Sequence, residues 1–322
     1  MYNSSSDEEF DPMTATRRLK QYKKKSSLKG DVAVLFGKAN TAYTFGDFSL
    51  AISLLSQVSS LAPSRPEPFK TLSLVYDALK QPRKAIAALL MAAVKGKETS
   101  RWLELADSAI KYDFPVIESY AVGRALISAP NDVSLHIRRA RILIKLGKRS
   151  ELSRAVNHLA AAHNFDPKNV EILVELVHLL IELERLDICK NILEKSILYF
   201  HSLNPPESPD FRILNYFCEL SMSEGHFQSV HTLLLDSARI GLTDNQSDPS
   251  PSELLQVFPP DLTSKLLVSF FYLSLPIDES ALSIVLSWDI HDYVDLYEFI
   301  ATAALTSDQY SLFSFFSLQF PS

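Results

Sequence analysis

Apolar side chains recur three and four residues apart along most of the chain, which is the spacing of amphipathic α-helices. The clearest example is residues 43–63, YTFGDFSLAISLLSQVSSLAP, in which a Gly-Asp break precedes a run of small and apolar residues. Pro63 closes this run, because proline cannot continue a helix. The pattern predicts a helix before Gly46, a short turn, and a second helix that ends before Pro63.

This two-helix unit recurs along the chain. After Gly46, equivalent breaks follow at intervals of 34, 33, 34, 37 and 41 residues, at Lys80, Asp113, Gly147, Glu184 and Gly225. A small residue precedes each break in step: Ala39, Ser73, Ala106, Ala140, Val177 and Cys218. Another small residue follows three of the breaks by five positions, Ala51, Ala85 and Cys189, and Ala155 follows Gly147 by eight. A bulky residue opens each unit, and Pro63, Pro130 and Pro167 close three of them: the openers are Leu35, Phe69, Trp102, His136, Leu173 and Leu214.

A period near 34 residues, built of two amphipathic helices, is typical of tetratricopeptide repeats. Two helices joined by a short turn cross closely, which requires a small side chain where their axes meet. One unit cannot bury its apolar stripe alone, so each stacks on the next. We therefore predict an all-α fold, with helix-turn-helix repeats stacked as a right-handed α-solenoid. The expected regions are a leader over 1–29, about six repeats over 30–240, a polar linker over 241–258, and further repeat-like helices over 259–322.

Composition agrees with this prediction. The chain has 322 residues, of which 47% are hydrophobic and only 8 are Gly, so it can bury a continuous core. Two Cys exclude a disulfide framework and favour a reducing compartment; both fall at small-residue positions, where buried packing is the expected role. The first residues are polar and acidic rather than a signal peptide, and the longest apolar stretch, 266–277, is interrupted by Pro276. We expect a soluble, intracellular protein.

Charge is distributed unevenly. Residues 1–29 carry seven basic and four acidic side chains, a net of +3, which leaves −9 for the remainder of a chain whose total is −6. An acidic array is poorly suited to follow a phosphate backbone, so direct DNA contact is expected to be absent or minor. Three interpretations of the basic tail stay open: a nuclear import signal, a nucleic-acid contact, or a solvated, disordered leader. The candidate import residues are Arg17, Arg18, Lys20, Lys23, Lys24 and Lys25.

A search for catalytic or metal-binding patterns finds none. The pairs His158 with His163, and His226 with His231, are five residues apart and so do not share a helical face. The chain contains no Gly-rich phosphate loop, nucleophile elbow or Cys-x-x-Cys pattern. We predict that the protein is not an enzyme and that it uses no cofactor and no metal.

The first helix of each unit is where a binding function is expected. Its inner side combines charged and apolar residues, which suits an extended or helical protein ligand. For each of these residues taken singly, exposure to solvent on a helix face is as good an interpretation as contact with a partner. The candidate groove residues are Phe36, Asn40, Tyr43, Lys70, Asp77, Asp107, Lys111, Arg141, Lys145, His178, Arg212 and Asn215.

Beyond the sixth repeat, three segments follow in a distinctive order. PPDLTSKLLVSFFYL at 259–273 precedes ALSIVLSW at 281–288 and DYVDLYEFIATAAL at 292–305. The chain resembles the tetratricopeptide subunit of transcription factor IIIC, in which a Pro-x-Asp-x-x-x-Lys-Leu helix precedes a Leu-Ser-Trp segment and a Tyr-x-Asp-Leu-Tyr helix. The matching residues are Pro259, Asp261, Lys265, Leu266, Leu286, Ser287, Trp288, Tyr293, Asp295, Leu296 and Tyr297.

The opening repeats, GKANTAYTFGDFSLAI at 37–52 and RWLELADSAI at 101–110, also look like this family, so the resemblance covers roughly residues 30–316. The resemblance implies a nuclear scaffold that joins other factor IIIC subunits and receives factor IIIB subunits, including the TFIIB-related one, for RNA polymerase III initiation. The alternative is a tetratricopeptide scaffold of another nuclear or cytoplasmic complex, such as one in RNA processing or cell-cycle degradation.

The last residues, QYSLFSFFSLQF at 309–320, are rich in aromatic residues and carry no charge. In the family a second block of repeats would cover this end of the array. We expect residues 309–320 to form an interface and to drive self-association of the isolated chain, because exposed aromatic area marks either an interface or an aggregation site. The candidate interface residues are Phe313, Phe315, Phe316 and Phe320.

Overall fold

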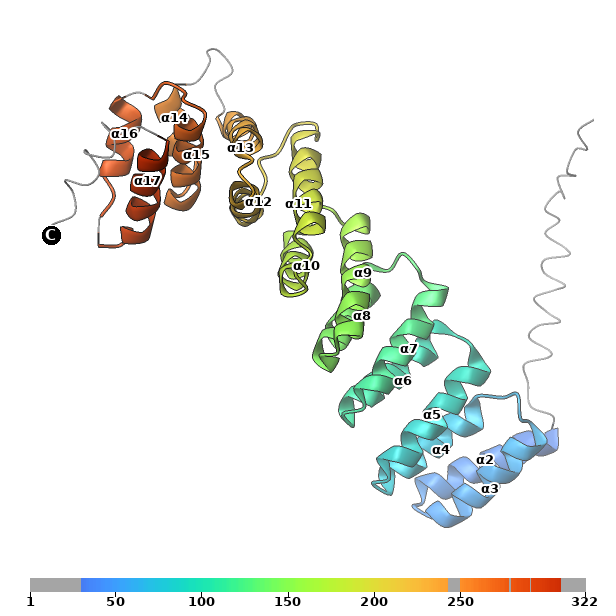
Figure 1. The fold of residues 1–322 in the computed structure, drawn as a ribbon. Helices are drawn as coiled ribbons and strands as arrows, with labels where there is room; N and C mark the ends of the chain where they lie inside the picture. The colour runs from blue at the N-terminus through green and yellow to red at the C-terminus, as the bar shows by residue number, and fades with distance from the viewer. Residues whose placement is uncertain (1–29, 243–249, 278, 290, 308–322) are drawn as a thin grey trace, which may run out of the picture. The chain divides into compact units, whose positions relative to one another are not determined.

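The computed structural model of the chain describes residues 30–242, 250–277, 279–289 and 291–307. Over these ranges the chain forms sixteen helices and no strand, which confirms the predicted all-α class (Figure 1). The chain divides into two compact units, residues 1–130 and 131–322. The leader with its candidate import residues (17–25) and the candidate C-terminal interface (313–320) lie outside the described residues.

The first unit consists of three helix pairs, each with a first and a second helix. The small residues predicted at the crossings of α2 with α3 and of α6 with α7, Ala39, Ala51 and Ala106, are completely buried. Ala85, at the crossing of α4 with α5, is also buried. The pairs are α2 (Gly30–Thr44) with α3 (Phe48–Leu61), α4 (Glu67–Ala78) with α5 (Pro82–Gly96), and α6 (Thr99–Lys111) with α7 (Pro115–Ser128).

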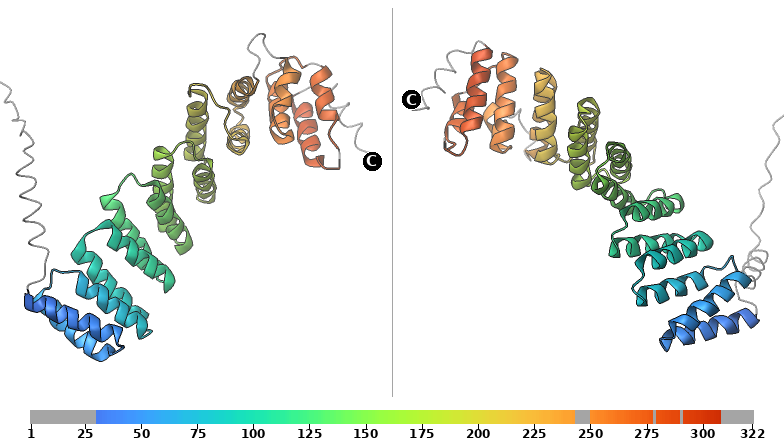
Figure 2. Two further views of the ribbon diagram at one scale, coloured as in Figure 1. Left: turned by 180° about the vertical axis from the view of Figure 1, so that it is seen from behind. Right: turned by 60° about the horizontal axis from the view of Figure 1, so that its bottom comes forward.

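The second unit begins with three further pairs and continues with four helices of less regular length (Figure 2). Ala140, Ala155, Val177, Cys189 and Cys218 are all fully buried, as the small-residue pattern predicts. The pairs are α8 (Val133–Leu146) with α9 (Arg149–Phe165), α10 (Val170–Glu182) with α11 (Leu186–His201), and α12 (Phe211–Ser223) with α13 (Phe227–Gly241). They are followed by α14 (Pro251–Gln256), α15 (Pro260–Tyr272), α16 (Glu279–Leu286) and α17 (Val294–Thr306).

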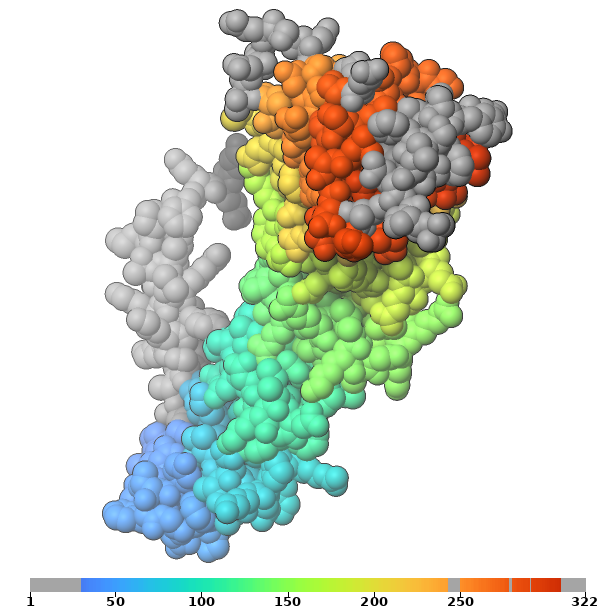
Figure 3. Space-filling view, turned by 90° about the vertical axis from the view of Figure 1, so that its left-hand side faces the viewer, coloured from blue at the N-terminus to red at the C-terminus, as the bar shows by residue number. Residues whose placement is uncertain are grey.

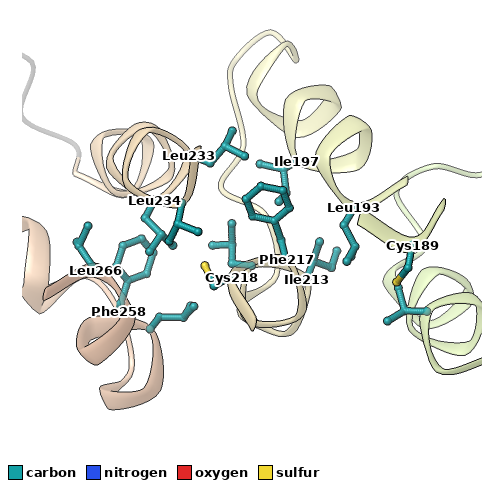
Figure 4. Close-up of a cluster of buried hydrophobic side chains, with 14 of the residues drawn as sticks. Cys189, Leu193, Ile197, Ile213, Phe217, Cys218, Leu233, Leu234, Phe258 and Leu266 are labelled. Carbon is teal, nitrogen blue, oxygen red and sulfur yellow. The ribbon is translucent and has the colours of Figure 1, made fainter. Parts of the chain in front are cut away.

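The core of the second unit runs without interruption from one pair to the next. Figure 4 shows Phe217 of α12 facing Ile197 of α11, with Leu234 of α13 and Leu266 of α15 on its other side. Phe217 is completely buried between these helices. Since fully burying one such side chain contributes about 1.5–3 kcal/mol, neighbouring pairs stabilise one another and no pair is an independent domain.

All six predicted breaks adopt the left-handed backbone conformation. The φ angles of Gly46, Gly147 and Gly225 are 80°, 69° and 78°, and those of Lys80, Asp113 and Glu184 are 56–57°. In most of these turns, the N–H after the break donates to the carbonyl five residues earlier, as Asp47 does to Ala42 (2.9 Å) and Arg185 to Leu180 (2.9 Å). This bond satisfies a carbonyl left open at the helix end and reverses the chain within three residues.

One further left-handed turn is not predicted by the repeat period. Ser274, after α15, has a φ of 53°, and Leu275 N–H donates to the Phe270 carbonyl at 3.0 Å. It lies 49 residues after Gly225, because an extra segment interrupts the period there.

The segment 241–258, expected to be a polar linker, is in part helical. Ser250 and Glu253 form a capping box, and Pro251 occupies the first turn of α14. Leu254 and Leu255 are buried in the hydrophobic core of the second unit. The prediction of a polar linker was wrong for α14. A six-residue helix can pack through only two apolar residues, and two apolar residues among polar ones give no clear helical pattern in the sequence.

We predict opposite effects of glycine changes at two turns. Replacing Glu184 with Gly should raise the free energy of unfolding by up to about 1 kcal/mol, because a left-handed non-glycine residue is strained by roughly 1–2 kcal/mol and glycine's larger unfolded entropy offsets part of the gain. Replacing Gly147 with Ala should lower the free energy of unfolding by a similar amount, although a Cβ there would meet no atom within 4 Å. Urea unfolding measures both; two unchanged midpoints would contradict the turn assignment.

Candidate protein-binding surface

The candidate groove residues lie on the first helices of the pairs. We call the exposed sides of α2, α4 and α6, and separately those of α8, α10 and α12, the first-helix faces of the two units. In the first unit the face carries Phe36, Asn40, Tyr43, Lys70, Asp77, Asp107 and Lys111. In the second unit it carries Arg141, Lys145, His178, Arg212 and Asn215.

Charged residues on the first unit's face pair between neighbouring first helices. Lys70 on α4 contacts Glu104 on α6 at 2.7 Å, and Lys111 on α6 contacts Asp77 on α4 at 2.8 Å. Both pairs are separated by 34 residues in the sequence. Hydrogen bonds from Lys111 and from the Tyr112 hydroxyl hold the pKa of Asp77 below its usual value. The repeat period therefore sets which charges meet.

The second unit repeats this arrangement. Arg141 on α8 binds Glu175 on α10, again 34 residues away. Arg212 on α12 binds Glu171 of α10 at 2.9 Å and also Asp210, the cap of its own helix. Asn215 accepts a hydrogen bond from Lys265 of α15. These charged side chains are held in place by their neighbours, so a ligand would meet an ordered polar surface.

Two of the aromatic candidates are less exposed than the sequence suggests. Phe36 and Tyr43 are half-buried and pack against the hydrophobic core formed by α2, α3, α4 and α5. The ring of Tyr43 lies 6.3 Å from that of Phe48 on α3, and Phe36 packs against the same cluster of buried side chains. Their packing role is shown by these contacts; a role in binding stays a prediction.

The first unit's face contains a cleft of about 450 Å³ between α2, α4 and α6. Phe36 and Leu74 provide apolar surface, and Leu74 is 44% exposed. Lys70 with Glu104 and Arg101 with Glu98 border the cleft as ion pairs. A cleft with an apolar floor and an oriented polar border is the usual form of a site for a protein segment.

The second unit also contains a groove of about 350 Å³ between α12, α15 and α17, together with the start of α13. Phe227 and Tyr272 stack at its edge with their ring centroids 3.9 Å apart. Phe299 of α17 and Lys265 of α15 also line it. The repeat pattern of the sequence does not indicate a site at these residues, because Lys265, Tyr272 and Phe299 follow the break in the repeat period.

Histidines join α9, α11, α13 and α15 in the second unit. His163 on α9 donates from Nε2 to Ser196 Oγ on α11 (2.9 Å), because that hydroxyl already donates to the Ile192 carbonyl. His201 and His231 make equivalent bonds to Ser237 (2.9 Å) and Ser269 (3.0 Å). Burial lowers the pKa of all three imidazoles.

A further histidine contact joins α8 to α9. The Nδ1 atoms of His136 and His158 lie 3.1 Å apart, a contact that sequence spacing could not show because the residues are 22 positions apart. Burial, then Arg139, His136 and Arg154, lower the pKa of His158 to about 4. His158 is therefore neutral at neutral pH.

The two cysteines are free and buried, as the small-residue pattern predicts. Burial raises the pKa of Cys189 to about 11 and that of Cys218 to about 12, so neither is a reactive thiolate at neutral pH. Within the described ranges, His, Cys, Asp and Glu form no cluster of three that could hold a metal ion. None of the described helices has the length and apolar character needed to cross a membrane.

Comparison with known proteins gives one curated relative of interest. The chain is 22% identical over 313 residues to human general transcription factor 3C polypeptide 3, and the match covers 92% of this chain. The chain spans about a third of that protein's length, 34%. No family model matches the chain.

Solved helical-repeat structures are similar to parts of this chain. A complex of Naa15 and Naa10 bound to HypK has a chain 16% identical, with a TM-score of 0.47, covering 85% of this chain and 39% of its own. YrrB, a tetratricopeptide protein with a peptide-binding site, is 18% identical, with a TM-score of 0.33 and coverage of 51% and 83%. A tetratricopeptide repeat protein from Parabacteroides merdae is 12% identical, with a TM-score of 0.32 and coverage of 84% and 99%.

We predict that acid destabilises the second unit through its buried histidines. Their native pKa values lie below the ordinary value of 6.5, to about 4 for His158, so below pH 6.5 the unfolded chain binds more protons than the folded one. Stability should be fully present above pH 6.5 and fall as the pH drops toward 4. Urea midpoints at pH 7.5 and 5.5 measure this.

Two variants control this measurement. His158→Gln should reduce the loss between the two pH values, whereas the exposed His291→Gln should leave it unchanged. Equal pH dependence in wild type and His158→Gln would contradict a role for this histidine.

Proposed function

We propose that this chain is a protein-interaction scaffold of transcription factor IIIC, which assembles factor IIIB subunits for RNA polymerase III initiation in the nucleus. The observation that carries the proposal is the similarity to general transcription factor 3C polypeptide 3, which extends over 92% of this chain. A match of that extent includes most of the region after the sixth pair, where the 34-residue period no longer holds. Repeat periodicity alone does not account for similarity there.

The geometry supports a binding role for the first-helix faces. Neighbouring first helices bring side chains 34 residues apart into contact, as with Lys70 and Glu104. Each unit adds a cleft with apolar surface, at Phe36 and Leu74 in one and at Phe299 in the other. A segment of another protein can bury an apolar side chain there and bond to the oriented charges around it.

Mechanistically, the proposal is one of assembly without chemistry. The packed cores fix the positions of the first helices. Most of the conformational entropy lost on binding is therefore lost by the flexible partner segment. Partners are other factor IIIC subunits and factor IIIB subunits, including the TFIIB-related one; direct DNA contact is minor, because the chain after residue 29 carries a net charge of −9.

Affinity purification of the tagged full chain from nuclear extract tests the proposal. Mass spectrometry should find factor IIIC and factor IIIB subunits enriched over an untagged control. A Leu74→Asp and Phe299→Asp double variant should lose part of this set, because both exposed side chains lie in clefts. Its matched control is Val116→Asp with Leu198→Asp, two exposed apolar residues outside those clefts.

Two results would contradict the proposal. One is a partner set from RNA processing or cell-cycle degradation without any polymerase III factor. The other is a wild-type partner set no richer in polymerase III factors than the untagged control; equal recovery of these factors by the wild type and both double variants would contradict only the placement of the contact in the clefts.

A further inference from the structure

The groove between α12, α15 and α17 has an apolar floor. Met222, Val268 and Ala303 line it beside the stacked rings of Phe227 and Tyr272. Tyr272 and Phe299 remain 40% and 37% exposed. Aromatic surface left exposed inside a groove of about 350 Å³ is typical of an interaction site.

Carboxylates extend the same helix faces beyond this floor. Asp261 precedes Lys265 by four residues on α15, Asp295 precedes Phe299 by four on α17, and Glu298 likewise precedes Thr302. Residues four apart share a helix face, which puts these carboxylates one turn from the groove-lining residues Lys265, Phe299 and Thr302. All three are exposed, and no described Lys or Arg forms an ion pair with them. Figure 3 shows the red surface of α17 exposed beside the orange surface of the preceding helices.

The one Lys or Arg residue after residue 239, Lys265, already has an acidic partner. From residue 240 to the last residue the sequence has eleven acidic residues and one basic residue, Lys265. The Lys265 side chain is only 13% exposed, and its Nζ binds Glu219 at 3.0 Å and also Asn215. The groove therefore presents apolar surface bordered by uncompensated negative charge.

We propose that this groove binds a lysine- or arginine-rich segment of a partner protein. An aliphatic or aromatic side chain of the segment occupies the floor at Phe299 and Tyr272, and its cations meet Asp261, Asp295 and Glu298. The inference rests on the proposed scaffold function and names the chemistry of one of its partners. Complementary charge selects this partner, since the field that attracts a basic segment repels acidic peptides and phosphate backbones.

Fluorescence anisotropy with the full chain tests this chemistry. The probe is a fluorescein-labelled 12-residue peptide with five lysines, two leucines and one phenylalanine. One control peptide replaces each lysine with glutamate, and the other replaces the leucines and phenylalanine with serine. The probe should bind about tenfold more tightly than either control, and its affinity should fall as NaCl rises from about 50 to 300 mM, since salt screens exposed charges.

Variants place the binding in the groove. Asp295→Asn combined with Glu298→Gln, and separately Phe299→Ser, should each weaken probe binding about fivefold or more, as expected when a central anchor or its paired charges are lost. The matched controls, Glu194→Gln and Leu198→Ser, remove an exposed charge and an exposed apolar side chain from α11 and should leave binding unchanged. Equal affinity in groove and control variants, or equal binding of the glutamate peptide, would overturn the inference.

The chain's own residues 17–29 share the proposed chemistry, with seven cations and Leu19, Tyr22 and Leu28. If a partner segment is the occupant, Lys23→Ser, Lys24→Ser and Lys25→Ser together leave probe affinity unchanged. A gain in affinity would show that the tail fills the groove, which would refute a partner as occupant.

Failure of this inference is distinguishable from failure of the proposed function. Capture of factor IIIC subunits without probe binding rejects the inference alone. Probe binding without capture of those subunits rejects the proposed function and leaves the groove's chemistry standing.

Discussion

The close crossing of two helices around a small buried side chain is the constraint on which the rest of the structure depends. Ala39, Ala106 and Ala140 are completely buried where first and second helices meet. A larger side chain there would separate the helix axes, because protein interiors have few voids to absorb it. A left-handed turn follows each first helix, as at Gly46 and Gly147. This turn ends the first helix and reverses the chain, so that the second helix packs closely against the first.

The crossing also determines what the first-helix faces present. Since successive pairs stack on one another, side chains 34 residues apart meet between neighbouring pairs, as Asp77 meets Lys111 and Arg141 meets Glu175. The same periodicity brings His163 to Ser196 on the second helices. Exposed ion pairs contribute little to stability individually, so their main effect is to orient the charges that a partner meets.

Much of this architecture could be predicted from sequence because it depends on local chemistry. Left-handed turns at Lys80 and Glu184 follow from the period even though neither residue is glycine, and the α7 and α9 ends follow from Pro130 and Pro167. The turn at Ser274 could not be predicted, because it lies 49 residues after Gly225 and so falls outside the regular interval.

The sites were predicted less completely than the fold. The charged face positions could be named from helical spacing, but their partners could not, since a pair such as Asn215 with Lys265 depends on how α12 and α15 pack. The groove at Phe299 was missed for the same reason. Phe36 was placed on the correct helix, but its partial burial depends on the neighbouring helices and not on α2 alone.

The most direct test of the central claim compares one substitution at two alanines of the first unit. Ala106→Leu enlarges the completely buried crossing residue of α6, and Ala87→Leu makes the same change at an exposed position of α5. Denaturant unfolding should show a loss of about 1–3 kcal/mol for Ala106→Leu, as overpacking a tight contact predicts, and a change within about 0.5 kcal/mol for Ala87→Leu. Equal unfolding free energies for the two variants would contradict the account, because the crossing would then tolerate a large side chain.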